Sequence, residues 1–263
     1  MFDFVKYSKK MPKVAGKFTC MYCGAENISF GGVAICTNCE GIASSTTPQA
    51  ADHNRVDAVR EISTHNRLHE YEESIKIYEQ LFNTAKDPML LYAEALTYIA
   101  YSNYELSRIS YDREGFMEEN AEHNYHASEL TSKAKLLLAK CSSMLRSGTP
   151  LSDAKTSAYH LFLAYLKFGD TAAARSALYN VKKLDGTLYE YASMQLGSEI
   201  GDFKGVLQHS EVLLKARWQP HIALYYAAYA LFKTGKTKEA KAIMGSIQGF
   251  IKSENTGRLL GVL

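Results

Sequence analysis

The chain has 263 residues, of which 46% are hydrophobic and 22% charged, and its formal net charge at pH 7 is only +2. This is the composition of an ordinary globular protein, and the length allows one or two domains. No apolar run approaches the roughly 18 residues of a membrane span, and residues 1–17 lack the apolar segment of a secretory signal. Because four of the five cysteines also lie in close pairs, we expect a cytoplasmic protein without membrane contact.

Residues 1–17 form a basic arm in which lysines alternate with aromatic residues. The lysines are Lys6, Lys9, Lys10, Lys13 and Lys17. Such a mixture could lie against the phosphates of a nucleic acid or against an acidic protein surface. It also fits a lead-in strand whose aromatic side chains tuck under the next module, and we favour this second interpretation.

Residues 18–42 contain two Cys-x-x-Cys pairs separated by twelve residues. The candidate metal ligands are Cys20, Cys23, Cys36 and Cys39. Two residues between the thiolates let each pair curl around one ion, and Gly24 and Gly41 suit the tight turns that follow. Between the pairs, apolar residues alternate around Gly31 and Gly32, which predicts a short β-hairpin over 28–35.

These features resemble a zinc ribbon. The resemblance implies one structural Zn²⁺ in a closed tetrahedral site, since four thiolates leave no position for water. A rubredoxin-type iron site is the alternative metal centre, and two disulfides are the alternative without metal. Because ~25 residues cannot bury a self-sufficient core, metal binding should be nearly the whole reason that the module folds. The helices beyond the linker should stay intact without it.

After a polar linker at 43–51, a helical pattern begins at residue 52 and continues to residue 249. The segment that ends at Asp87-Pro88 predicts a pair of helices. A helix from about 90 to 110 and a longer one from about 116 to 145 follow, and Cys141 falls on the apolar face of the longer helix as a core residue. Residues 250–263 form either a capping helix, which we favour, or a tail offered to a partner.

Residues 156–249 repeat one pattern three times. The turn residues Gly169, Gly201 and Gly235 are 32 and then 34 residues apart. A residue small or slim enough for tight helix packing follows each glycine by five positions. These residues are Ala174, Val206 and Ala240. Apolar residues recur at helical spacing on both sides of each glycine, which predicts stacked helical hairpins.

The repeated pattern resembles the tetratricopeptide (TPR) repeat. Its middle copy is looser, since Ser193 and Gly197 stand where larger or more helix-favouring residues are usual. The resemblance implies a mostly α-helical fold, in which a superhelical stack of antiparallel helical hairpins (a TPR-like α-solenoid) follows the small zinc-ribbon module.

No catalytic constellation stands out. The helical segments lack dinucleotide-binding and metalloprotease motifs, and no nucleophile, base and orienting group can be proposed together. His123 and His126 lie among glutamates and fit a solvated charged face better than a metal site. We therefore expect a protein without enzymatic activity and without a small-molecule substrate.

The first functional hypothesis is a protein-interaction scaffold that holds a peptide or partner helix on the concave face of the repeats. The candidate groove residues are Tyr159, Tyr191, Tyr225, Tyr229 and Phe232. The first three stand ten residues before the turn glycines, and the TPR resemblance places that position in the groove. We then expect their rings to stay accessible, whereas packing between hairpins, the alternative, would bury them.

The second hypothesis is a factor that contacts RNA or DNA, alone or on the ribosome, through the ribbon and the lysine arm. The zinc-ribbon resemblance supports it, because such modules are common in the transcription and translation machinery. Against it, the chain has no arginine before Arg55, and only Tyr22 and Phe30 are candidates for stacking on bases.

Overall fold

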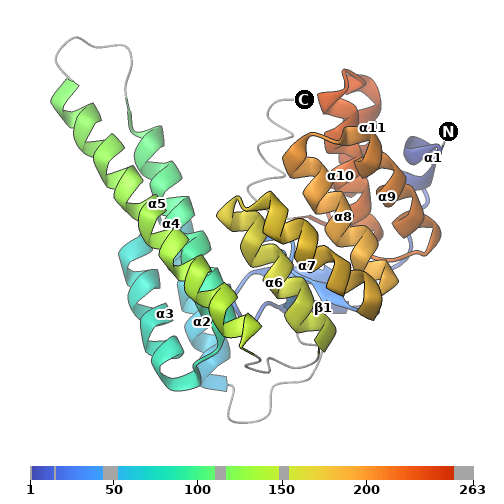
Figure 1. Cartoon of the computed structure of the whole chain (residues 1–263). Helices are drawn as coiled ribbons and strands as arrows, with labels where there is room; N and C mark the ends of the chain where they lie inside the picture. Colours follow the sequence, from blue (N-terminus) through green and yellow to red (C-terminus); the bar gives the residue numbers. More distant parts are fainter. Residues whose placement is uncertain (1, 15, 44–52, 110–116, 148–153, 252–263) are drawn as a thin grey trace. The chain divides into compact units, whose positions relative to one another are not determined.

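A computed structural model of the protein describes residues 2–14, 16–43, 53–109, 117–147 and 154–251 (Figure 1). Within these ranges the chain is mostly helical, with eleven helices and two small antiparallel sheets near its beginning. The packing of the helices is consistent with a helical solenoid. None of the helices in the described ranges is long and apolar enough to cross a membrane.

The chain divides into two compact units. The first comprises Met1–Cys20, Ala25–Thr47 and Ser152–Leu263, and the second comprises Met21–Gly24 and Pro48–Leu151. The predicted capping segment lies almost entirely outside the described residues.

The second unit consists of two helical pairs. In the first pair α2 (His53–Arg67) packs on α3 (Tyr71–Ala85), and in the second α4 (Pro88–Ser107) packs on α5 (Met117–Arg146). The helices predicted on both sides of Asp87 are thus confirmed. Asp87 begins α4, because its Oδ1 accepts a hydrogen bond from Met89 N at 2.9 Å, and Pro88 stands in the first turn, where no N–H is needed.

The long pair formed by α4 and α5 (Figure 1) is held by a row of apolar residues along α5. Its buried members, three or four positions apart, are Ala127, Leu130, Ala134, Leu138, Cys141 and Leu145. Small residues in this row let the two helices approach closely. The prediction that Cys141 is a core residue is confirmed, and burial raises the pKa of its thiol to about 12.

Glu94 is a buried acidic residue of α4. Burial, assisted by the nearby Glu79 carboxylate and opposed by Lys140, raises the pKa of Glu94 to about 7. The folded-state pKa of Glu94 exceeds the unfolded value, so the folded protein favours the protonated carboxyl. The stability of the fold is therefore greatest at low pH with respect to this group, and it falls as the pH rises towards 7.

We therefore expect Glu94→Gln to raise the free energy of unfolding of the second unit at pH 8 by about 1–3 kcal/mol, because the amide removes the buried charge. The difference should close well below pH 4.5, where the wild-type carboxyl is neutral in both states. Urea unfolding followed by circular dichroism at both pH values measures it. Glu129→Gln, on the exposed side of α5, serves as the control, and equal stabilities of wild type and Glu94→Gln at pH 8 would contradict the expectation.

In the first unit three helical hairpins follow one another along the chain. They are α6 (Ala154–Phe168) with α7 (Thr171–Leu184), α8 (Gly186–Ile200) with α9 (Phe203–Lys215), and α10 (Pro220–Lys233) with α11 (Thr237–Ile247). The three predicted turn glycines lie between the helices of each hairpin, with φ angles of +87°, +79° and +82°, a region that only glycine enters without strain.

The packing positions after the turns are also confirmed. Ala174, Val206 and Ala240 are all fully buried. In the middle hairpin, a Cβ on Gly197 would come within 3.1 Å of the Val206 side chain, so this glycine permits the close approach of α8 and α9. Gly197, the unusual residue of the middle copy, therefore makes room for Val206, which is larger than the alanine at the same position of the other two copies.

The amino-terminal arm forms a helix rather than the lead-in strand that we favoured. Helix α1 (Phe4–Ser8) packs on α10 and α11. The hydroxyl of Tyr7 donates to Leu214 O at 3.0 Å, and Ser8 Oγ lies 3.2 Å from Ser246 Oγ. The aromatic residues of the arm do tuck under another part of the protein, but that part lies at the other end of the chain.

The strands pair differently from the predicted hairpin over 28–35. Strand β1 (Gly16–Thr19) pairs with β2 (Glu26–Ser29), and β3 (Ala34–Ile35) pairs with β4 (Ile42–Ala43). Each Cys-x-x-Cys turn therefore has a hairpin of its own, because Cys20 N bonds Ala25 O and Cys36 N bonds Gly41 O across the turns. In the second turn Glu40, and not Gly41, adopts the left-handed conformation, with φ 62°.

Candidate metal centre

The two Cys-x-x-Cys turns bring the four predicted ligands together. The Sγ atoms of Cys20, Cys23, Cys36 and Cys39 all lie within 4.8 Å of one another, and all four residues are buried. Cys20 Sγ and Cys39 Sγ are 3.7 Å apart, whereas a disulfide would require about 2.0 Å. The cluster could therefore hold a metal ion. Among the residues that the structure describes, this is the one group of three or more His, Cys, Asp or Glu side chains close enough to do so.

Asn27 organises the second turn, and sequence analysis did not single it out. Its side chain is buried, and its Nδ2 donates to Ala25 O at 2.8 Å and to Cys36 Sγ at 3.4 Å. Its Oδ1 accepts from the N–H and the hydroxyl of Thr37 at 2.8 and 2.9 Å. Together with Asn38 N, also 3.4 Å from Cys36 Sγ, the amide places two donors beside one sulfur. Such donors stabilise a thiolate and orient it toward a metal.

Residues of the first turn pack on the helices of the second unit. Tyr78 Oη donates to Tyr22 O at 3.0 Å, and Arg55 Nε donates to Met21 O at 3.2 Å. Gly24 lies so close to α2 that a Cβ would meet Val59 O at 1.8 Å, and its φ of +69° also favours glycine. Tyr22 is buried, so its ring is not available to stack on a base.

Glu40, directly after the last cysteine, holds the second turn against α6 and α10 of the same unit. Its carboxylate accepts from Tyr226 Oη at 2.9 Å and lies 2.9 Å from Lys167 Nζ. Its carbonyl oxygen accepts from Tyr159 Oη at 2.8 Å. Burial alone would lower the pKa of Lys167, but the Glu40 charge outweighs it and the pKa is raised. These partners are far away in the sequence, and no local pattern could have indicated them.

The expectation that the groove tyrosines stay accessible is wrong for Tyr159 and Tyr191. Tyr159 is fully buried and Tyr191 is 1% exposed, and their ring centroids lie 5.9 Å apart. The reason is that the second turn packs against them, through Glu40 and through Ile42 N, which donates to His160 Nε2 at 3.0 Å. Part of the predicted groove is thus covered by the protein's own ribbon.

The other candidate groove residues lie on α10 and remain partly exposed. They are Tyr225, Tyr229 and Phe232. Burial is the main cause that raises the pKa of Tyr225 to about 12. Nearby, Phe30 covers His221 with a centroid distance of 4.8 Å, and burial lowers the pKa of His221 to about 3, which keeps that ring neutral.

The five lysines of the arm are all exposed, as a surface contact would require. Lys6 lies on α1, Lys9 is its carboxyl-terminal cap and Lys17 lies on β1. Of the five, Lys6 and Lys10 line a common cavity.

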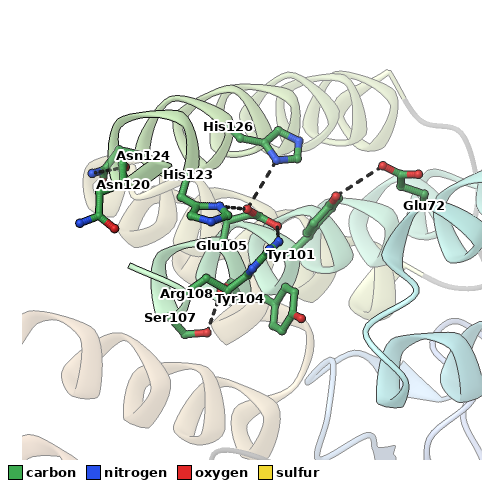
Figure 2. A network of polar contacts seen from close by, with 10 residues as sticks. All are labelled: Glu72, Tyr101, Tyr104, Glu105, Ser107, Arg108, Asn120, His123, Asn124 and His126. Carbon is green, nitrogen blue, oxygen red and sulfur yellow. Dashed lines mark hydrogen bonds and ion pairs between the residues drawn. The ribbon is translucent and has the colours of Figure 1, made fainter. Parts of the chain in front are cut away.

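A second polar cluster lies between α4 and α5 and centres on Glu105 (Figure 2). The nearly buried carboxylate accepts from His123 Nδ1 at 2.6 Å and also faces His126 and Arg108 at 3.8 and 3.4 Å. His123 is therefore not part of a solvated charged face, as we had expected, but ties the two helices together. Tyr101, in contact with His126, extends the cluster to Glu72 on α3.

Comparison with known proteins adds no relative. No protein-family model matches the chain, and neither the curated proteins nor the solved structures contain a significant match. The site is therefore interpreted from its own geometry.

Proposed function

We propose that the protein is a non-enzymatic interaction scaffold, in which TPR-like helical hairpins bind a protein partner and a zinc ribbon stabilises the hairpins on which it packs. The observation that carries the proposal is the partly exposed aromatic stripe on α10. Tyr225, Tyr229 and Phe232 follow one another at helical spacing, so they lie on one side of the helix. Aromatic side chains of this kind offer a large contact area at a small entropic cost.

Contacts around the stripe support its role as a docking surface for a partner helix or peptide. The edge of Phe203, on α9, faces Tyr229 with a centroid distance of 6.0 Å, and Lys233 Nζ lies 5.5 Å from the same ring. These neighbours hold the ring in place before a partner arrives, which lowers the entropy lost on binding. The partner would add to a face that the ribbon already covers in part.

The proposed metal is structural zinc. Zinc bound to four thiolates at about 2.3 Å spaces the sulfurs about 3.8 Å apart, and the distance from Cys20 Sγ to Cys39 Sγ is 3.7 Å. Four buried cysteines leave no open position for a reacting water, so the ion would hold the two turns together rather than catalyse. Iron, which takes the same ligands, is the alternative.

Replacing Tyr225 and Tyr229 together by serine should abolish partner binding, because aromatic anchors of this kind contribute at least ~2 kcal/mol each. Quantitative affinity capture from the source organism measures the effect. The control is Tyr179→Ser on α7, a tyrosine that is 61% exposed and lies off the stripe. The scaffold proposal predicts partners that the wild type and Tyr179→Ser retain and the double variant loses. Identical partner sets for all three proteins would contradict it.

The second candidate is a nucleic-acid- or ribosome-associated factor, and the five exposed lysines of residues 6–17 favour it. Phosphate contacts make such binding fall steeply with salt, whereas capture by an aromatic stripe does not. Binding in the capture experiment that disappears at moderate salt, and is indifferent to Tyr225 and Tyr229, would support this candidate instead.

A further inference from the structure

An open cavity of about 550 Å³ lies between the amino-terminal arm and the turn after α9. One wall is formed by residues 2–12, around helix α1, and the other by Arg217 alone, in the turn between α9 and α10. The hydrogen bond from Tyr7 Oη to Leu214 O joins residues 207 positions apart and fastens one wall to the other. The cavity therefore exists only in the folded protein, and no segment of the sequence could have indicated it.

The charge that surrounds this cavity is positive. Lys6, Lys10 and Arg217 line it, against one acidic residue, Asp3. The Asp3 carboxylate is already engaged, because its Oδ1 accepts from Lys6 N at 2.8 Å as the cap of α1. Burial raises the pKa of Tyr7, and the positive charge of Arg217 opposes the rise. The carboxylate keeps its charge in that hydrogen bond, so the lining residues carry three positive charges and one negative charge.

Aromatic rings form the apolar part of the lining. Phe2 and Tyr7 both face the cavity, and their ring centroids lie 5.8 Å apart. The hydroxyl of Tyr7 is held by Leu214 O, so this ring has a fixed position. Fixed aromatic rings beside cations are the combination that proteins use to bind a base together with its phosphate.

Arg217 occupies a backbone position where glycine would be easier to accommodate. Its φ is +55°, and it follows α9 with its N–H bonded to Leu214 O at 3.1 Å. The turns inside the three hairpins place glycine in this conformation. A side chain in the left-handed region costs stability relative to glycine, and at this position the side chain brings a guanidinium to the lining of the cavity.

We propose that this cavity binds a nucleotide, with the phosphates against Lys6, Lys10 and Arg217 and the base against Phe2 and Tyr7. The volume falls within the range of small-ligand sites, about 300–1,000 Å³. The planar arginine can hold two phosphate oxygens at once. The inference does not depend on the scaffold proposal, and it shares only Lys6 and Lys10 with the nucleic-acid candidate.

Titration calorimetry on the full, metal-loaded chain tests the proposal with three probes: ATP, inorganic pyrophosphate and a single-stranded RNA of about six nucleotides. We expect ATP to bind with a sub-millimolar Kd and pyrophosphate to bind at least about tenfold more weakly, because it lacks the base. The fluorescence of Trp218, the single tryptophan and the neighbour of Arg217, gives a second signal.

Variants distinguish binding in the cavity from non-specific attraction to the positive charge of the arm. Arg217→Gly removes a cation while restoring the residue that the backbone favours, so it should weaken ATP at least about tenfold without lowering the melting temperature. Lys10→Gln should weaken ATP as well. Lys9→Gln is the matched control, because Lys9 is exposed beside α1 and does not line the cavity, and it should change the Kd for ATP less than about twofold.

Two outcomes would support the proposal, and they identify different sources of the nucleotide. ATP that binds as tightly as the RNA indicates a free nucleotide. RNA that binds more tightly, and is weakened by Arg217→Gly, indicates the same base and phosphate contacts within a strand. Equal affinities for pyrophosphate and ATP, full binding by Arg217→Gly, or the absence of ATP and RNA binding at about 1 mM ligand would each overturn the proposal.

Discussion

Cys36→Ser, or removal of the metal by a chelator, is expected to unfold residues 16–43 and to destabilise the helices α6, α8 and α10 as well. The ribbon cannot bury enough apolar surface to fold alone, and a structural zinc site of this type contributes about 10 kcal/mol or more. From the sequence we expected the helices to stay intact. The structure changes that expectation, because Glu40 and Ile42 form hydrogen bonds with side chains of α6 and α10, and Tyr159 on α6 in turn bonds Gln195 on α8.

Metal analysis and hydrogen exchange measure the two parts of this prediction. We expect one zinc ion per wild-type chain, none in Cys36→Ser, and faster exchange in α6, α8 and α10 of the variant. Cys141→Ala is the control, because it removes a buried cysteine that is not part of the cluster and should leave the metal content unchanged. Wild-type protein without metal under reducing conditions would contradict the site, and unchanged exchange in the helices would contradict the coupling. A red preparation would identify iron.

Tyr159→Ala is expected to lower the free energy of unfolding of the first unit by about 3–5 kcal/mol, the range for deletion of a large buried aromatic ring. The ring is fully buried, and its hydroxyl bonds both Glu40 O at 2.8 Å and Gln195 Oε1 at 3.1 Å. Tyr159→Phe keeps the ring and removes only these hydrogen bonds, so it should cost about 1–2 kcal/mol.

Denaturant unfolding followed by Trp218 fluorescence reports on this unit, because the indole lies 5.4 Å from the Tyr191 ring. The exposed Tyr179→Ala should change the stability by less than about 0.5 kcal/mol and serves as the control. A small effect of Tyr159→Ala, similar to that of Tyr179→Ala, would mean that the ribbon leaves the inner face in solution. The groove would then be open to a partner after all.

The parts of the fold that depend on neighbouring residues were predictable from the sequence. The turn glycines, the buried Ala174 and the four cysteines all act over a few residues, and their chemistry determines their local structure. Asp202 illustrates this, since its carboxylate accepts from Gly205 N at 2.9 Å and begins a helix directly after a turn glycine. Signals of this kind place helices, hairpin turns and metal ligands, but not the surfaces that these elements share.

Several of the features that sequence analysis missed depend on contacts between distant residues. Tyr159 is spaced like a groove residue, but its exposure depends on whether Glu40 reaches it, and no periodicity encodes that. The arm forms a short helix capped by Asp3, and no local pattern indicates that its Tyr7 contacts Leu214. The strand pairs also differ from the prediction. Gly31 and Gly32 form a bend, but the strands before and after it pair elsewhere, each across its own cysteine turn.

The direction of protein synthesis gives the position of Glu40 a further consequence. Its partners Tyr159 and Tyr226 lie 119 and 186 residues further along the chain. At about 5–20 residues per second, the ribosome takes roughly 10–40 s to make the chain between Glu40 and Tyr226. The helices α2 to α5 emerge during this interval and are able to fold, whereas the first unit can close only when α10 has been made. The segment around Glu40 is thus among the first to be synthesised, but it can make its native contacts only after most of the chain has been translated.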